Sequence, residues 1–330
     1  MNRLIVTENH NPWHNLALEE QLFDTQKEDV TLYLWQNQNT VVIGRNQNAW
    51  KECRFSELER DGGRLARRTS GGGAVFHDLG NLNFTFLATR ALYDQQRQLS
   101  VITEAAKSLG VDARFTGRND ILAFGKTGAA CETGAKFSGN AFRFSNTAGL
   151  HHGTLLVHVD MGKLGKYLAP SEDKLRAKGV DSVRARVCNL TDFVPCLTIE
   201  DVKSAVISAF EREYGATSLL SEGELDLAAV ERLTQKHASR EWRLGATPAF
   251  DMELYTRFPW GGLELALSFS HGKIESLRAF SDAMDEAFIL RIPEELTGCV
   301  FESAAMAERL RSLNAPEAED IANWILEKGF

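Results

Sequence analysis

The chain has 330 residues, of which 43% are apolar and 25% charged, and its net charge is −8. This composition is typical of a globular protein and excludes a disordered or collagenous chain. The acidic balance also disfavours a general nucleic-acid binder. No apolar stretch is long enough to span a bilayer and no signal peptide is visible, so we expect a cytoplasmic location. Five scattered cysteines without a C-x-x-C pair argue against a disulfide framework or a zinc site.

The first part of the chain mixes helical and strand patterns without the regular rhythm of a doubly wound parallel sheet. Runs rich in β-branched and aromatic residues predict strands at Thr31–Trp35, Thr40–Gly44 and Gly153–Asp160. Only four polar residues separate the first two runs, so we expect these strands to pair. Apolar spacing and capping residues predict helices after Asn11-Pro12, around residues 102–109, and around residues 202–210.

The pattern changes near Gly245–Pro248. Alternating apolar residues over 263–269, a Ser270–Gly272 turn and a second run ending near Phe280 predict a β-hairpin that buries one face. Helical patterns follow around residues 306–313 and 321–325. We therefore expect a large domain over residues 1–245 and a small α/β domain over residues 248–330.

The most unusual segment is Arg67–Asp78, which contains three successive glycines at positions 71–73. Successive glycines expose backbone N–H groups that can hold an anion. Arg67 and Arg68 add charge and bidentate donors suited to phosphate or carboxylate. From spacing alone, a flexible surface hairpin with solvated arginines explains this segment equally well.

Two common phosphate-binding patterns are not met. The string Gly125-Lys126-Thr127 ends like a P-loop, but Asp120 stands where that motif needs a glycine. The glycine run also fails the dinucleotide pattern, since Phe76 stands where the last glycine should be. A nucleotide would therefore have to bind in another way.

Lys136 begins an alternating segment, Lys136–Ala141, whose small residues leave room for a ligand. A lysine held there can neutralise charge on a phosphoryl group, although a solvent-facing strand lysine is the more usual case. His151 and His152 are adjacent, so they point to opposite faces of a strand and cannot form a metal pair; one of them is expected to be structural. No protease or metallohydrolase motif is recognisable.

In their order and their amino-acid sequence, these segments resemble those of the bacterial lipoate–protein ligase A family over nearly the whole chain. The matching segments are Pro12–Ala17 with the acidic pair that follows it, Val41–Arg45, Arg67–Asn81, Gly117–Asp120, Lys136–Ala141, His152–Leu156, Lys178–Val180, Ser182–Arg184 and Trp260–Gly262. The resemblance implies an α+β fold: a biotin/lipoate-ligase-like catalytic domain with a mixed, largely antiparallel sheet, plus a small C-terminal accessory domain.

The resemblance also implies a two-step reaction. Lipoate attacks the α-phosphate of ATP to give bound lipoyl-AMP and pyrophosphate, and a lysine of an apo-lipoyl domain then displaces AMP. The implied cofactors are ATP and Mg²⁺. The implied partners are lipoic acid and the apo-lipoyl domains of 2-oxoacid dehydrogenase complexes and of the glycine cleavage H protein, without nucleic acid or membrane.

The site residues follow from the same resemblance. Lys136 is the implied catalytic residue and contacts both substrates. The implied ATP-binding residues are Arg68, Gly73, Ala74, Val75, Phe76 and Lys136. The implied lipoate-binding residues are Lys136, Ser70, Gly71, Gly72, Trp35 and His152, although a plain core position is the simpler interpretation of Trp35. The basic segment with Lys178, Val183 and Arg184 resembles the adenylate-binding loop, and Asp120 is the candidate carboxylate for the metal.

The nearest alternative is an octanoyltransferase of the same fold, which passes an acyl group through a catalytic cysteine. Cys131 and Cys188 lie near the expected site and keep this alternative open. The basic segment and the C-terminal domain favour ATP chemistry. A biotin ligase lacks support because the Gly-Arg-Gly-Arg signature is absent, and the retained Arg68 and Lys136 argue against a non-catalytic binding protein. The sequence leaves open lipoate versus octanoate, the preferred lipoyl domains and the oligomeric state.

Overall fold

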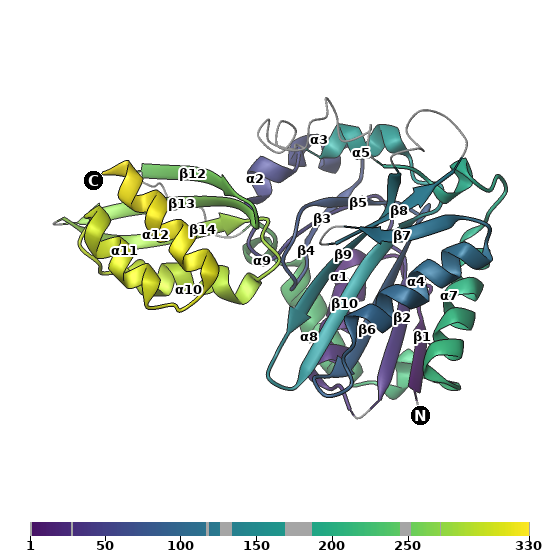
Figure 1. Cartoon of the computed structure of the whole chain (residues 1–330). Helices are drawn as coiled ribbons and strands as arrows, with labels where there is room; N and C mark the ends of the chain where they lie inside the picture. The colour runs from purple at the N-terminus through teal and green to yellow at the C-terminus, as the bar shows by residue number, and fades with distance from the viewer. Residues whose placement is uncertain are drawn as a thin grey trace.

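The computed structural model describes residues 2–27, 29–116, 119–125, 134–168, 187–244, 252–270 and 272–329. The large domain is built on one sheet whose strands are β1 (Asn2–Val6), β2 (Val30–Trp35), β6 (Asn81–Thr89), β7 (Asp112–Thr116), β8 (Asp120–Phe124), β9 (Ala135–Phe144), β10 (Ala148–Leu156) and β11 (Thr217–Leu219). Their spatial order is β11-β1-β2-β6-β10-β9-β8-β7 (Figure 1). The β11, β1 and β2 pairs are parallel and all others antiparallel, which confirms the mixed, largely antiparallel sheet.

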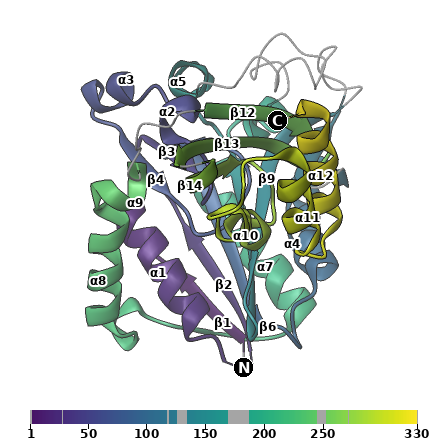
Figure 2. The same ribbon diagram turned by 90° about the vertical axis from the view of Figure 1, so that its left-hand side faces the viewer.

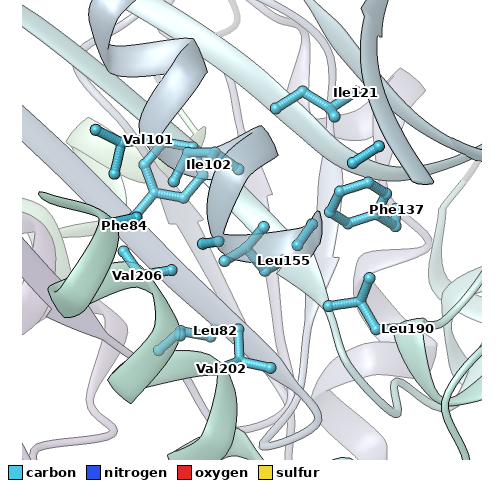
Figure 3. Close-up of a cluster of buried hydrophobic side chains, with 14 of the residues drawn as sticks. Leu82, Phe84, Val101, Ile102, Ile121, Phe137, Leu155, Leu190, Val202 and Val206 are labelled. Carbon is cyan, nitrogen blue, oxygen red and sulfur yellow. The ribbon is translucent and has the colours of Figure 1, made fainter. Parts of the chain in front are cut away.

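Helices cover both faces of this sheet. Helices α4 (Gln95–Ser108) and α7 (Ile199–Tyr214) pack on one face, where Phe84 of β6 and Leu155 of β10 meet their apolar side chains (Figure 3). Helices α1 (Pro12–Asp24) and α8 (Leu227–Ala238) lie on the other face (Figure 1). Because side chains alternate along a strand, each central strand contributes side chains to the hydrophobic cores on both faces of the sheet.

A second sheet has the order β4-β3-β5 and consists of β3 (Thr40–Ile43), β4 (Arg64–Arg67) and β5 (Val75–His77). The predicted pairing of the first two strands is therefore wrong: β2 lies between β1 and β6, whereas β3 lies between β4 and β5. Both strands exist, but β2 is buried throughout and finds its partners in the central sheet. The short elements α2 (Ala49–Glu52), α3 (Phe55–Arg60), α5 (Met161–Tyr167), α9 (Arg240–Leu244), η2 (Leu190–Asp192) and η3 (Glu222–Glu224) complete the large domain.

The other local predictions hold with small shifts of boundary. Helix α1 begins at Pro12, and the side chain of Asn11 accepts a hydrogen bond from the Trp13 backbone N–H, as expected of an N-cap. Helix α7 begins after the capping box formed by Thr198 and Asp201. Strand β10 begins five residues earlier than predicted and ends at Leu156.

The small domain contains the predicted hairpin. Its sheet has the order β12-β13-β14, with β12 (Met252–Phe258), β13 (Gly261–Ser270) and β14 (Lys273–Ser281). Helices α10 (Glu286–Leu296), α11 (Ser303–Arg311) and α12 (Pro316–Lys328) pack on this sheet around a separate core (Figure 1). The expected boundary at 245–248 falls outside the described residues. Within those residues, no helix is both long and apolar enough to cross a membrane.

Figure 2 shows the small domain in front of the large one, and among the described residues backbone hydrogen bonds join the two domains just before α10. The Gly72 backbone N–H donates to the Ala283 carbonyl oxygen at 3.0 Å, and the Ser281 N–H donates to the Asn46 carbonyl at 2.7 Å. Asn46 Nδ2 in turn donates to the Glu286 carbonyl at 3.1 Å. The small domain therefore sits directly on the glycine-rich segment.

Candidate functional site

The residues that connect β4 to β5, positions 68–74, form a glycine loop that lies over the centre of the main sheet. A Cβ atom on Gly72 would lie 3.8 Å from the Cβ atom of Ala141 in β9, and Ala141 pairs with His152 in β10. On the other side of the loop, a Cβ atom on Gly44 would lie only 2.2 Å from the Gly72 carbonyl oxygen. The loop is thus held in place by close backbone packing, and it is not a flexible hairpin.

The Arg68 guanidinium shapes this loop from inside. Its Nη2 donates to the carbonyls of Gly71 and Gly73 at 2.6 and 2.8 Å, and its Nε donates to Ser70 Oγ at 3.1 Å. Burial lowers the pKa of Arg68 to about 10, so the side chain stays charged at neutral pH. A direct contact between Arg68 and a phosphate would require some of these bonds to be exchanged.

Arg67 points away from the loop and has a structural role. Its guanidinium donates to five backbone carbonyls, and burial, followed by the nearby charge of Arg45, lowers its pKa to about 10. Those carbonyls belong to residues 44, 45, 47, 242 and 243. Arg67 therefore joins α9 to the turn after β3, and only Arg68 of the two arginines belongs to the loop.

Lys136 lies on the same sheet face as the loop, further along β9. Its Nζ would be 2.8 Å from a Cβ atom on Gly139, so the missing side chain at 139 is what accommodates the ammonium group. Gly139 and Ala141 are two residues apart, which places Lys136 about 7 Å along the strand from the loop contact. Lys136 Nζ also lies 2.7 Å from Asp120 Oδ1, and both side chains are partly exposed.

The chain that returns after residue 186 runs beside Lys136. The Cys188 N–H donates to the Lys136 carbonyl at 2.9 Å, and Val187 forms a parallel bridge with Lys136. The expected adenylate-loop residues Lys178, Val183 and Arg184 themselves lie outside the described residues, as does Cys131.

A buried polar cluster beneath the loop contains three expected site residues, Ser70, His152 and Trp35, together with Glu19, for which the sequence indicated no role. Ser70 Oγ lies 2.7 Å from His152 Nε2, and His152 Nδ1 lies 2.8 Å from Glu19 Oε1. Trp35 joins the cluster through Thr85. Every residue from 15 to 23 of α1 is buried, and a carboxylate inside such a helix must be paired. The sequence shows the acidic pair but not which of its two carboxylates faces the site.

The two other histidines near the cluster are neutral. His151 points to the opposite face, as expected, and lies between the amides of Gln98 and Asn140; burial, then the proximity of His152, lowers its pKa to about 3. His77 Nδ1 lies 3.2 Å from Asn37 Nδ2, which places the ring proton on Nε2. Burial, then Arg68, lowers the pKa of His77 to about 3.

The expected ATP-binding residues 73–76 are partly exposed to solvent at positions 73–75. Gly73, Ala74 and Val75 are half-buried, and nothing lies within 4 Å of a Cβ atom placed on Gly73. Phe76 is buried against Tyr167, so it can offer a ligand its backbone only. The described residues contain no group of three or more His, Cys, Asp or Glu side chains that could hold a metal ion. A magnesium ion here would take most of its ligands from phosphates and water.

Comparison with known proteins agrees with this geometry. The model of the lipoyl protein ligase A/B catalytic domain matches residues 11–211, and that of the bacterial lipoate protein ligase C-terminus matches residues 247–325. A structure of P. falciparum LipL1 in complex with lipoate is 27% identical with a TM-score of 0.86, covering 99% of this chain and 100% of that chain. A bipartite lipoate protein ligase of Thermoplasma acidophilum, described with its E2 lipoyl domain, is 29% identical with a TM-score of 0.65, covering 76% and 99%.

A structure described as lipoate-protein ligase A bound with ATP is 28% identical with a TM-score of 0.62, covering 74% of this chain and 98% of that chain. The catalytic-domain model spans more than half of the 330 residues, and the C-terminal model accounts for most of the remainder. The chain belongs to the lipoyl protein ligase A/B family.

Proposed function

We propose that this enzyme is an ATP-dependent lipoate–protein ligase that forms lipoyl-AMP and transfers the lipoyl group to a lysine of apo-lipoyl domains. The observation that carries this proposal is the convergence of the glycine loop and Lys136 on one face of β9 and β10. A loop that offers backbone N–H groups and a nearby ammonium group suits a reaction between two anions. The matched relatives described with ATP and with lipoate support the same substrates.

The activation step needs charge neutralisation, because a carboxylate must approach the α-phosphate of ATP. In the proposal, the backbone of residues 73–76 binds the phosphates, and Lys136 contacts both the phosphate and the attacking carboxylate. When bound, Mg²⁺ would supply further neutralisation of the phosphates. Asp120 remains the candidate carboxylate for the ion, and it would first have to leave its ion pair with Lys136.

The lipoate carboxylate is placed beside the buried polar cluster, where Ser70, Gly71, Gly72 and His152 meet. Ser70 and His152 offer hydrogen-bonding groups there. The Gly72 N–H would become available once it leaves the Ala283 carbonyl. Trp35 would contribute an apolar ring from the core of the sheet. The residues that follow Lys178, including Val183 and Arg184, would cover the adenylate and protect it from water.

The acceptor is proposed to be an apo-lipoyl domain of a 2-oxoacid dehydrogenase complex or the glycine cleavage H protein. One matched relative is described together with an E2 lipoyl domain, which supports a lipoyl domain as the protein substrate. In the proposal, Lys136 holds the adenylate while the acceptor lysine attacks the mixed anhydride.

An octanoyltransferase would need a reactive cysteine, and the described cysteines do not provide one in the site. Burial raises the pKa of Cys53 to about 12, which keeps that thiol protonated. Cys188, beside Lys136, is buried and its Sγ donates to the Ala135 carbonyl at 3.3 Å. Cys299 belongs to the core of the small domain. These positions favour the ATP-dependent reaction over a transferase that uses Cys53, Cys188 or Cys299. Cys131 lies outside the described residues and is tested by its replacement.

Pyrophosphate release from ATP tests the proposal directly. The enzyme is incubated with ATP, Mg²⁺ and lipoate, octanoate or biotin, with the acceptor domain omitted. Lipoate should support release and biotin should not, while octanoate measures the breadth of the acid site. Absence of release with every acid, combined with acyl transfer from an octanoyl carrier protein, would establish the transferase instead.

A further inference from the structure

The polar cluster beneath the glycine loop is one continuous chain of hydrogen bonds. It begins at Arg68, whose Nε donates to Ser70 Oγ at 3.1 Å, and Ser70 Oγ lies 2.7 Å from His152 Nε2. On the other side of the imidazole ring, His152 Nδ1 lies 2.8 Å from Glu19 Oε1. All four side chains are buried, so each must be satisfied within the protein.

At the Trp35 end of this hydrogen-bond network, the structure determines which atom donates in each bond. Trp35 Nε1 donates to Thr85 Oγ1 at 3.0 Å, and an indole N–H can only donate. Thr85 therefore uses its single proton on Glu19 Oε1, 2.6 Å away. Glu19 accepts this bond as a carboxylate, and it also needs a proton on His152 Nδ1. The tautomer of His152 is thus set by Glu19.

The state of His152 then decides where the Ser70 hydroxyl points. Arg68 Nε can only donate, and its single proton is shared between Ser70 Oγ and the Gly71 carbonyl, each at 3.1 Å, so Ser70 Oγ is an acceptor towards Arg68. When His152 is neutral, its Nε2 has no proton and the Ser70 hydroxyl must donate to it. When His152 is protonated, Nε2–H donates to Ser70 Oγ, and the Ser70 proton is released to donate to a ligand oxygen.

Charge balance couples the second state to the binding of an anion. Without ligand, the charges of Arg68 and Glu19 compensate one another. Lys136 is paired with Asp120 until a substrate phosphate draws it away, so in the absence of ATP it does not act as the counterion of the lipoate carboxylate. A substrate carboxylate beside Ser70 adds a buried negative charge, which is costly without a counterion. We propose that Glu19 is a positioning residue that enables His152 to take up a proton when the carboxylate of the acid substrate binds beside Ser70.

The neighbouring groups make His152 the site of proton uptake. It faces Glu19 from α1, Arg68 from the glycine loop and His77 from β5, while His151 follows on the opposite face of β10. His77 and His151 are buried without a carboxylate partner, and both have a pKa of about 3. His152 alone of these three rings has a carboxylate on Nδ1 to stabilise the imidazolium form.

The inference rests on the proposed function only in taking lipoate as the acid. It is tested by calorimetric titration of lipoate into the full-length protein, in buffers that differ in ionisation enthalpy. At a pH of about 8, where an ordinary histidine is neutral, binding should take up about one proton per lipoate. The affinity for lipoate should then fall about tenfold for each further pH unit.

Variants distinguish a positioning role of Glu19 from a purely structural one. Glu19→Gln keeps the shape of the side chain but removes its charge, so proton uptake should fall to near zero and affinity should fall about tenfold or more. Glu20→Gln is the matched control, because Glu20 bonds His237 and Lys236 instead. This control should lose stability but keep the proton uptake. If Glu19→Gln does not fold, His152→Gln replaces it with the same expected loss of uptake.

The outcomes distinguish the two proposals. Failure of the wild-type protein to bind lipoate contradicts the proposed function. Lipoate binding without proton uptake overturns the role of Glu19 and His152 while leaving the ligase proposal intact. Uptake that persists in Glu19→Gln also overturns this role, and uptake that persists in His152→Gln shows that the proton resides on the acid itself.

Discussion

The ion pair between Lys136 and Asp120 gives the proposed catalytic lysine a defined resting position. Lys136 lies over Gly139 and its ammonium group is only partly exposed. A substrate phosphate that enters this space competes with a single carboxylate for the lysine. The pair therefore keeps the ammonium group in place without committing it to a buried network.

Lys136→Ala should leave the protein folded and abolish most of its lipoate-dependent pyrophosphate release. Loss of one preorganised charge at a developing negative charge typically slows a reaction on the order of a hundredfold or more. Transfer from chemically supplied lipoyl-AMP should also weaken. Lys126→Ala, which alters the string that ends like a P-loop, is the matched control and should be close to neutral. The reverse pattern in the two variants would show that the wrong lysine was chosen.

The cysteines should be dispensable for ligase activity. Replacement of all five by serine or alanine should leave ATP-dependent lipoylation largely intact, provided that the protein folds, because no step of the proposed reaction uses a thiol. Lipoylation of an apo-lipoyl domain, monitored by mass spectrometry, measures this. Loss of activity on replacing Cys131 or Cys188 alone, in a folded protein, would favour an acyl-thioester transferase.

Adjacent residues show what the sequence could reveal about the site. The glycine run and Lys136 are recognisable as site residues through the resemblance, because by spacing alone a surface hairpin and a solvent-facing lysine explain them as well or better. Glu19 and Glu20 are chemically identical neighbours, yet one bonds His152 and the other bonds His237. Only the packing of α1 between the sheet and α8 separates their roles, and no local pattern encodes that.

At the level of elements, Glu20 joins α1 to α8. Burial alone would raise the pKa of Glu20, but hydrogen bonds from His237 and Lys236 outweigh it and lower the pKa to about 2. Because the folded-state pKa is depressed, the stabilisation is complete above the unfolded value of about 4.5 and is lost as the pH falls towards 2.

Acid unfolding checks this contribution. The wild-type protein should lose on the order of 3 kcal/mol of unfolding free energy through Glu20 over this pH range, in proportion to the size of the pKa shift. Glu20→Gln should be less stable at neutral pH and should depend less steeply on pH below 4.5. Equal acid dependence in both proteins, followed by circular dichroism, would contradict the importance of this link.

The segment 174–190 is expected to become protected when the adenylate binds. Across residues 163–190 the sequence carries seven basic side chains against three acidic ones, so an anionic ligand can supply the missing charge partner. Hydrogen exchange in the presence of a non-hydrolysable lipoyl-adenylate analogue should slow over this segment. Exchange that is equally slow with and without the analogue would indicate a preformed structural loop.

The strands show which pairings the sequence pattern can predict and which it cannot. The alternation in β13 and β14 identifies a hairpin because one face of that sheet is buried and the turn is short. The same kind of argument failed for β2 and β3, which are close in sequence but belong to different sheets. Pairing between distant segments, such as β2 with β6, depends on the global fold.

At the scale of the whole molecule, the two domains are expected to reorient when the adenylate forms. The Gly72 N–H is engaged by the Ala283 carbonyl, so an anion that uses this N–H must displace the small domain. Small-angle scattering should therefore differ between the free protein and its complex with the lipoyl-adenylate analogue. Identical curves would contradict the reorientation.

The resemblance predicted the fold class of both domains, because its motifs run through nearly the whole chain. It did not predict the contact between them. That contact uses the backbone groups of Gly72 and Ala283 and the side chain of Asn46, and backbone groups leave no signature in residue type.

The described contact between the domains consists largely of backbone hydrogen bonds, and this has a consequence for how the small domain is held. Because both domains belong to one chain, the small domain is present near the glycine loop at an effective concentration in the millimolar range, as is typical of short tethers. A few hydrogen bonds are then sufficient to keep the domain seated, because the tether supplies the proximity that two separate proteins would have to gain through affinity. A single bound ligand can then shift the equilibrium between the seated and the displaced small domain. When the ligand leaves, the tether allows the contact to form again.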